Sequence, residues 1–340
     1  MKTASWPVRF KKQWVEGWYQ PPAWWQYGLL PLSWIFQILS RLRYGYYYLK
    51  GPTRLPVPVI IVGNISVGGT GKTPLVATIA HFLKKHGWEP GIVTRGVGGN
   101  IPAHVVTLVT PISCARQVGD EAVLLARQTD CPVSIGRNRP QAGAYLLQYF
   151  PEVNILLCDD GLQHYALARD LEIAVIEGQR RLGNGWCLPA GPLRENPRRL
   201  KKVDFIVTNN GPTLEKEWPM QVKLGEWLYQ VDYPEQKKPL QQLAGKKVHA
   251  VAAIGYPEKF FTMLRNRGID VIEHAFEDHY QFLEKDLTFD DDLPIVMTEK
   301  DAVKCHMLLP KGWYIPLEVT LSPFFMSNLL RRIQNGQKVT

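Results

Sequence analysis

A glycine-rich loop is the part of the sequence whose residue types and spacing most directly indicate chemistry. It reads Ser66, Val67, Gly68, Gly69, Thr70, Gly71, Lys72 and Thr73. Glycines allow successive backbone N–H groups to surround the oxygens of a phosphate. In loops of this kind the lysine neutralises the terminal phosphates of a nucleotide, and the following hydroxyl binds Mg²⁺. The loop therefore predicts a site for nucleotide phosphates and Mg²⁺, although Ser66 stands where the usual pattern has glycine.

Such a loop binds phosphate only between a strand and a helix, and the flanking residues predict both. Residues 57–62 form a continuous apolar, β-branched run, which is typical of a strand buried on both faces. Apolar residues then recur at helical spacing from Leu75 to Leu83, and Gly87 is a plausible stop. This context favours a phosphate-binding loop over the alternative, a glycine-rich turn with a surface lysine.

Two acids are the expected metal ligands beside this loop. Asp159 and Asp160 directly follow residues 154–158, which are mostly hydrophobic and predict another strand. A carboxylate at the end of a strand next to a phosphate loop commonly holds the metal ion. One of the pair is therefore expected to bind Mg²⁺, and the sequence does not distinguish which. The alternative is that both acids cap the turn before Gly161.

Strand–helix alternation along the rest of the chain predicts an α/β fold of the P-loop NTPase type. Strands are expected at 91–94, 133–135, 153–158, 172–176 and 203–208, and helices at 118–128 and 140–150. Alternation resumes later with segments at 247–254, 258–267, 271–275, 295–298 and 301–308. We therefore predict a mostly parallel sheet flanked by helices in residues 55–210, a linker or antiparallel excursion at 211–245, and a smaller second α/β lobe at 246–340.

The N-terminal arm carries most of the net charge of +9. Residues 1–54 contain eight basic side chains against one acidic one, Glu16, together with six of the 11 tryptophans. Prolines and polar residues interrupt the uncharged run before Arg41, so we do not expect a transmembrane span or a signal peptide. Aromatic and basic residues together favour a helix that lies on the membrane surface. The alternative is a helix packed on the core with a solvated basic flank.

Other features of the composition exclude several classes of protein. The five cysteines contain no C-x-x-C pair, so neither a zinc site nor a disulfide framework is expected, and a reducing cytoplasm is favoured. No nucleic-acid module is recognisable, so we expect no nucleic-acid partner. The sequence does not indicate an oligomeric state.

Six stretches give the chain a specific resemblance to a known family. They are residues 63–74 (GNISVGGTGKTP), 94–96 (TRG), 118–121 (VGDE), 159–164 (DDGLQH), 188–195 (LPAGPLRE) and 298–304 (TEKDAVK). With these motifs the chain resembles tetraacyldisaccharide 4'-kinase, the lipid A 4'-kinase of Gram-negative bacteria. The resemblance covers nearly the whole chain, and its DDGLQH and LPAGPLRE motifs are more specific than the phosphate loop alone.

The resemblance implies an activity and a set of roles. The family transfers the γ-phosphate of ATP, with Mg²⁺, to the 4'-hydroxyl of a tetraacylated glucosamine disaccharide 1-phosphate, giving lipid IVA at the cytoplasmic face of the inner membrane. It implies that Asp120 is the base near the acceptor hydroxyl, with His279 as its partner. It also implies that Arg194 and Glu195 lie near the phosphates and the metal.

The residue chemistry agrees with these roles. A carboxylate can take the proton of a sugar hydroxyl, and a histidine can orient that carboxylate. The alternatives are that Asp120 is an ordinary acid at a helix N-terminus and that His279 belongs to a surface loop.

A basic run follows Arg194 and includes Arg198, Arg199, Lys201 and Lys202. Guanidinium groups suit two-point contact with phosphate, so Arg194 is expected near the reaction. The rest of the run is expected either to attract the membrane or the substrate, or to form a solvated loop. Arg137 and Arg139 are weaker candidates for phosphate contact.

A second class of function shares the phosphate loop and the basic arm. It is a membrane-associated nucleotide switch that hydrolyses ATP or GTP to regulate a partner. The sequence shows no motif for guanine specificity, which favours the kinase.

Overall fold

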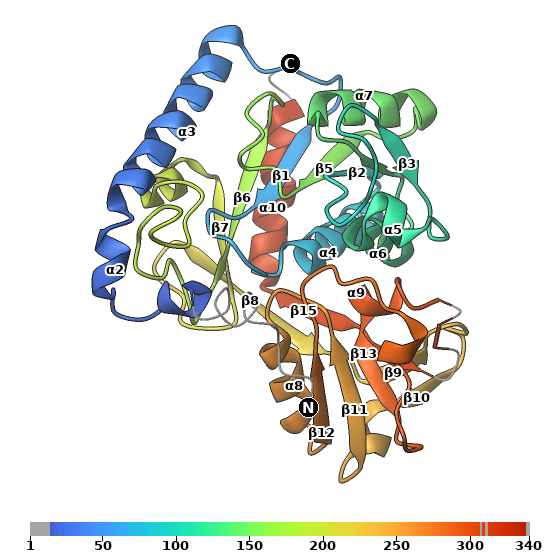
Figure 1. The fold of residues 1–340 in the computed structure, drawn as a ribbon. Coiled ribbons are helices and arrows are strands. Elements are labelled where there is room, and N and C mark those ends of the chain that lie inside the picture. The colour runs from blue at the N-terminus through green and yellow to red at the C-terminus, as the bar shows by residue number, and fades with distance from the viewer. Residues whose placement is uncertain (1–13, 307, 310–311, 338–340) are drawn as a thin grey trace.

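The computed structural model describes residues 14–306, 308–309 and 312–337. The chain folds into two lobes, each built on a β-sheet, with a long helix along one side of the first lobe (Figure 1). This arrangement confirms the predicted α/β fold with a mostly parallel sheet flanked by helices.

The first sheet has nine strands. From one edge to the other they are β15 (Leu317–Leu321), β8 (Glu217–Leu224), β7 (Phe205–Asn209), β6 (Leu171–Glu177), β1 (Val59–Gly63), β5 (Ile155–Asp159), β2 (Pro90–Thr94), β4 (Val133–Ile135) and β3 (Thr107–Val109). The strands from β8 to β4 run parallel, and only β15 and β3 are antiparallel to their neighbours. Val62 of β1 pairs with Asp159 of β5, so the phosphate loop and the two acids leave the sheet at the same edge.

The second sheet has six strands. In order they are β10 (Lys237–Pro239), β9 (Trp227–Gln230), β14 (Trp313–Ile315), β13 (Ile295–Thr298), β11 (Lys247–Ala252) and β12 (Asp270–Ala275). Helix α8 (Pro257–Arg265) packs on it through Phe260, Phe261 and Leu264. The short helix α9 (Glu299–Ala302) follows β13, and the 3₁₀ helices of this half are η2 (Leu240–Leu243) and η3 (Glu284–Asp286).

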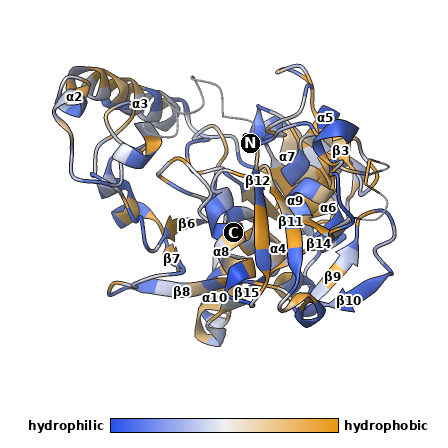
Figure 2. Ribbon diagram, turned by 60° about the horizontal axis from the view of Figure 1, so that its bottom comes forward, coloured by the Kyte–Doolittle hydropathy of each residue, from blue (hydrophilic) through white to orange (hydrophobic). Residues whose placement is uncertain are grey.

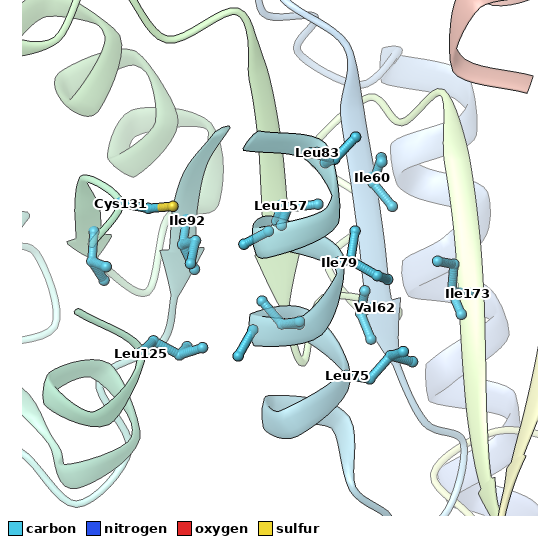
Figure 3. Close-up of a cluster of buried hydrophobic side chains, with 14 of the residues drawn as sticks. Ile60, Val62, Leu75, Ile79, Leu83, Ile92, Leu125, Cys131, Leu157 and Ile173 are labelled. Atoms are coloured by element: carbon cyan, nitrogen blue, oxygen red, sulfur yellow. The ribbon is translucent and has the colours of Figure 1, made fainter. Parts of the chain in front are cut away.

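Helices cover both faces of the first sheet because its central strands are apolar on both faces. Helices α4 (Lys72–Lys85), α6 (Asp120–Thr129) and α10 (Pro323–Gln337) share one core with Ile60 and Val62 of β1. Helix α7 (Arg139–Tyr149) packs on the other face, with Val59 and Ile61. Figure 3 shows side chains of α4 packed against β1. This packing holds the start of α4, and therefore the phosphate loop, against the sheet.

The helix expected at 118–128 corresponds to α6, which begins at Asp120. A separate short helix, α5 (Ala115–Val118), precedes it, and Gly119 separates the two with a φ of 92°. A Cβ atom at Gly119 would lie 2.4 Å from the carbonyl oxygen of Val97, so only glycine fits this close approach of two backbones. The break places Asp120 at the first position of α6.

The C-terminal segment differs from the predicted division of the chain. Strand β15 pairs with β8 of the first sheet, and α10 buries Phe325 and Leu329 in the core of the first lobe. The second lobe as a structural unit therefore ends near Ile315, whereas the sequence places all of 246–340 in it. Alternation along the chain indicates what the elements are, but it does not indicate which sheet they join. The same holds for 211–245, which contributes β8 to the first sheet and β9 and β10 to the second.

Within the described part of the predicted N-terminal arm, α2 (Trp24–Tyr27) and α3 (Leu30–Lys50) lie along the outside of the first lobe (Figure 1). Residues 1–13 of that arm lie outside the described residues. Ser33 is the one residue of α3 that is buried among those described, and its hydroxyl donates to the carbonyl of Cys187 at 2.8 Å. Much of α3 is hydrophobic (Figure 2), and many of its large apolar side chains are exposed. None of the helices among the described residues has the length and hydropathy that a membrane span needs.

Glu217, at the start of β8, ties that strand to the end of β7. Its carboxylate accepts hydrogen bonds from Arg181 Nη2 and Thr208 Oγ1, both at 2.6 Å, and from the backbone N–H of Leu214 at 3.0 Å. Burial on its own would raise the pKa of Glu217, but these hydrogen bonds lower it to about 2.

Replacing Glu217 with glutamine is expected to lower the free energy of unfolding by about 1–2 kcal/mol at pH 7, because a charged acceptor is lost. The folded-state pKa lies below the ordinary 4.5, so this contribution is present above pH 4.5 and is lost as the pH falls towards 2. Urea unfolding at pH 7 and pH 3 measures it, with the exposed Glu235→Gln as control. An equal loss at both pH values would contradict this prediction.

Candidate active site

The phosphate loop joins β1 to α4, as the sequence predicts. Left-handed backbone occurs at Gly68 (φ 106°) and Gly71 (φ 90°), whereas Ser66 is not among the residues with positive φ. A serine side chain is therefore compatible with the first position of the loop. Asn209, at the end of β7, donates from Nδ2 to the carbonyl of Thr70 at 3.0 Å and so fixes the loop against the sheet.

The segment 188–195 lies beside the start of the phosphate loop. The N–H of Arg194 donates to the carbonyl of Ile65 at 2.6 Å, and the N–H of Val67 donates to the carbonyl of Pro192 at 2.8 Å. These antiparallel contacts give the LPAGPLRE motif its structural role, because they bring Arg194 to the phosphate loop.

Asp160 is held by two cations at this edge of the sheet. Lys72 Nζ lies 3.5 Å from Asp160 Oδ1, and Arg194 Nη1 lies 2.9 and 3.0 Å from the two carboxylate oxygens. Burial alone would raise the pKa of Asp160, but the charges of Lys72 and Arg194 hold it below its ordinary value. Asp160 thus remains ionised and positions the two cations that were predicted to contact phosphate.

Asp159 has the surroundings that suit a metal ligand. Its Oδ2 accepts a hydrogen bond from Thr73 Oγ1 at 3.1 Å, and its buried Oδ1 has no hydrogen-bond partner among the described residues. Burial, reinforced by the negative charge of Glu121, raises the pKa of Asp159 to about 7. A divalent cation would satisfy the free oxygen and favour the ionised form, so Asp159 and Thr73 fit Mg²⁺.

The described part of the chain contains no cluster of three or more His, Cys, Asp or Glu side chains arranged to hold a metal.

Glu195 lies close by, but both of its carboxylate oxygens already accept hydrogen bonds. Oε1 accepts from Gln163 Nε2 at 2.7 Å, and Oε2 accepts from the hydroxyl of Tyr165 and lies 3.6 Å from Arg199 Nε. These partners join the loop after β5 to the 3₁₀ helix η1 (Pro197–Lys202). Glu195 therefore lacks the free oxygen that supports a metal role for Asp159. The metal role expected for Glu195 stays a prediction.

Further arginines surround Asp160. Burial lowers the pKa of Arg95, and the neighbouring charges of Arg139, Arg137 and Arg194 lower it further. Arg139 is fully buried and donates from Nη1 to the carbonyl of Gly136 at 2.6 Å. The two weaker candidates therefore belong to a positive region that suits phosphate anions.

The structure brings Asp120 and His279 together across the two lobes. His279 Nδ1 lies 2.8 and 3.0 Å from the two oxygens of Asp120, whose side chain is 1% exposed. Burial would raise the pKa of Asp120, but the hydrogen bond with His279 and nearby lysines lower it. The same hydrogen bond raises the pKa of His279. The pair is therefore an ionised carboxylate with a histidine that donates from Nδ1.

This pair adjoins the phosphate loop. A Cβ atom at Gly255, in the loop after β11, would lie 3.4 Å from Asp278 Oδ2 and 3.7 Å from the backbone nitrogen of Gly69. Asp278 precedes His279, and Glu121 follows Asp120 and acts electrostatically on Asp159. The predicted base and the predicted metal ligand thus belong to one site between the lobes.

Two lysines of this site were not singled out from the sequence. Lys300 Nζ lies 2.9 Å from Glu121 Oε1 and 3.2 Å from Asp278 Oδ1. Lys304 Nζ lies 3.6 Å from Asp120 Oδ2. Both belong to the TEKDAVK motif, but neither residue type nor spacing indicates that they face an acid in the other lobe.

The chain is similar to several known proteins. Residues 25–334 match the family described as Tetraacyldisaccharide-1-P 4'-kinase. The tetraacyldisaccharide 4'-kinase of Methylobacillus flagellatus is 45% identical, over 94% of this chain and 96% of that protein. The one of Nitrosococcus oceani is also 45% identical, over 94% of each chain. A crystal structure of LpxK from Aquifex aeolicus in complex with ATP has a TM-score of 0.76 at 28% identity, and covers 91% of this chain and 99% of that chain.

These matches include the phosphate loop, the strand that ends in Asp159 and the second lobe that carries His279. On this basis the chain belongs to the tetraacyldisaccharide-1-P 4'-kinase family.

Proposed function

We propose that this chain transfers the γ-phosphate of ATP to the 4'-hydroxyl of a tetraacylated glucosamine disaccharide 1-phosphate, giving lipid IVA, at the cytoplasmic face of the inner membrane. The observation that carries the proposal is the buried Asp120–His279 pair beside a phosphate loop. A nucleotide hydrolase needs only to orient a water molecule, whereas an alcohol acceptor benefits from a carboxylate that removes its proton. Family membership supports the same reaction.

Transfer of a phosphoryl group depends mainly on positioning and on stabilisation of charge. Lys72 and Arg194 supply positive charge at the phosphate loop, where Asp160 holds both side chains. Asp159 and Thr73 would hold Mg²⁺, which neutralises charge on the phosphate oxygens when it is bound. Asn209 keeps the loop in place.

The proton of the acceptor hydroxyl goes to Asp120 in this proposal. The carboxylate is ionised at neutral pH because its pKa lies below the ordinary value. His279 donates to it from Nδ1 and restricts its orientation. As the hydroxyl oxygen forms its bond to the γ-phosphorus, the bond from that phosphorus to ADP breaks and the proton moves to a carboxylate oxygen of Asp120.

We infer that α3 places the site at a membrane surface. Several of its large apolar side chains are more than half exposed, among them Trp34, Ile38 and Leu42. They recur at intervals of four residues, so they lie on one side of the helix. The hydroxyl of Ser33 in α3 donates to the carbonyl of Cys187, which directly precedes the segment 188–195 that carries Arg194. The ring of Tyr44 packs against the ring of Tyr165, whose hydroxyl donates to Glu195 of that segment. The arm is thus attached to the catalytic region.

The reaction itself is tested by incubating the protein with labelled ATP and the tetraacyl disaccharide 1-phosphate and measuring the product mass. We expect a gain of one phosphate on the distal sugar. Lys72→Ala is expected to lower kcat by about 10²- to 10³-fold and Asp120→Asn by about 10²- to 10⁴-fold. The exposed Lys85→Ala, at the other end of α4, is the control and is expected to leave kcat unchanged.

ATP hydrolysis without a phosphorylated lipid would contradict the kinase and favour a nucleotide switch. A nearly unchanged kcat in Asp120→Asn would exclude Asp120 as the base.

The two adjacent acids are expected to respond differently to Mg²⁺. Asp159→Asn should raise the Mg²⁺ concentration for half-maximal activity by about tenfold or more, because it removes the free ligand oxygen. Asp160→Asn should change this concentration less, since its carboxylate is paired with Lys72 and Arg194. Calorimetry of ATP binding at a series of Mg²⁺ concentrations provides a second readout. A larger effect of Asp160→Asn would assign the metal to Asp160 instead.

Membrane contact is tested by replacing Trp34, Ile38 and Leu42 together with serine. Binding to vesicles that contain phosphatidylglycerol should weaken by about tenfold or more, because each buried apolar side chain contributes about 1.5 kcal/mol or more. Ile112→Ser with Phe324→Ser removes exposed apolar side chains elsewhere and is the matched control. If sedimentation with vesicles is the same for both variants, α3 is not the membrane contact.

A further inference from the structure

The side chain of Lys304 is completely buried between two acids. That side chain is 0% exposed, and its Nζ lies 2.8 Å from Asp301 Oδ1 and 3.6 Å from Asp120 Oδ2. The ring of Phe282, with its centroid 5.1 Å from Nζ, covers it from another side. A buried ammonium group is strongly unfavourable unless it is paired, so these two carboxylates determine where Lys304 points.

Asp301 fixes Lys304 from within the second lobe. The Oδ2 of Asp301 accepts from Thr298 Oγ1 at 2.6 Å and from the backbone N–H of Ala253 at 3.0 Å. Ala253 lies two residues before Gly255, whose loop approaches the phosphate loop. One buried network therefore joins the loop that adjoins Gly69 to the cation that faces Asp120.

Lys304 is a cation that faces both buried acids, Asp120 and Asp301. His279 adds a further positive charge beside Asp120 only in its protonated form. Among the described residues Lys300 also acts on Asp120, and it is itself paired with Glu121 and Asp278. Without Lys304 the buried group would carry a surplus negative charge, and Asp120 would take up a proton more readily.

We propose that Lys304 is a positioning residue for phosphoryl transfer, which from the second lobe holds the Asp120 carboxylate ionised and oriented towards the acceptor hydroxyl. The inference rests on the proposed role of Asp120 as base. Lys304 lies behind the carboxylate, against Asp301 and Phe282, and acts through Asp120.

The test is Lys304→Met, which keeps the length of the side chain and removes its charge. We expect kcat to fall by about 10- to 100-fold, because the base is displaced and partly protonated. The midpoint of the acidic limb of the kcat–pH profile should move up by about one pH unit, because a cation within about 4 Å of a carboxylate lowers its pKa. KM for ATP should change less than about twofold, because ATP is held by other residues.

A purely structural role, in which Lys304 only neutralises Asp301, predicts a different result. Lys304→Met leaves Asp301 buried without its partner and is expected to lower the melting temperature. The double variant Lys304→Met with Asp301→Asn removes both charges, so it should recover most of the melting temperature. We expect its kcat to stay low and its acidic limb to stay displaced. Recovery of kcat and of the pH profile together with the melting temperature would overturn the proposal.

A variant lacking the base separates this inference from the proposed function. In an Asp120→Asn background, adding Lys304→Met should change the residual kcat less than about twofold, because Lys304 acts through Asp120. Full activity of Asp120→Asn alone would refute the base assignment itself. If Asp120→Asn is inactive, whereas Lys304→Met has the kcat and pH profile of the wild type, only the role of Lys304 is refuted.

Discussion

The ionised state of one buried carboxylate, Asp120, depends on how the two lobes meet. Asp120 is almost completely removed from water, and an unpaired carboxylate in a protein interior is strongly unfavourable. Its partner from its own lobe, among the described contacts, is the backbone N–H of Glu121, whereas its cationic partners, His279 and Lys304, come from the second lobe. The proposed base is therefore an ionised group where the lobes meet, next to the phosphate loop.

At the other side of the site, two adjacent acids have opposite properties because their surroundings differ. Asp160 faces Lys72 and Arg194 and has a lowered pKa, whereas Asp159 is buried against the sheet with one free oxygen and a pKa of about 7. One carboxylate thus orders the cations of the phosphate loop, and the other keeps a free oxygen that the proposed Mg²⁺ would contact. The separation follows from the end of β5, where Asp159 is still in the strand and Asp160 adopts a left-handed φ of 51°.

Much of the first lobe could be predicted from the sequence because its strands are continuous apolar runs and its helices have clear apolar spacing. The phosphate loop and the acids after β5 followed from the same pattern. The return of β15 and α10 to the first lobe could not be predicted, since apolar spacing does not identify the partner sheet. Lys304 was missed for a similar reason, because a lysine near the end of a short helix is ordinarily expected in solvent.

The most direct test of the ionised Asp120 is its own titration. Protein labelled with ¹³C at the aspartate carboxyl groups, compared by NMR with the Asp120→Asn variant, identifies the Asp120 signal. We predict that this signal keeps the chemical shift of a carboxylate as the pH falls through 3.8, the ordinary pKa of aspartate. Uptake of a proton at or above pH 3.8 would contradict this prediction, because the second lobe would then not stabilise the charged carboxylate.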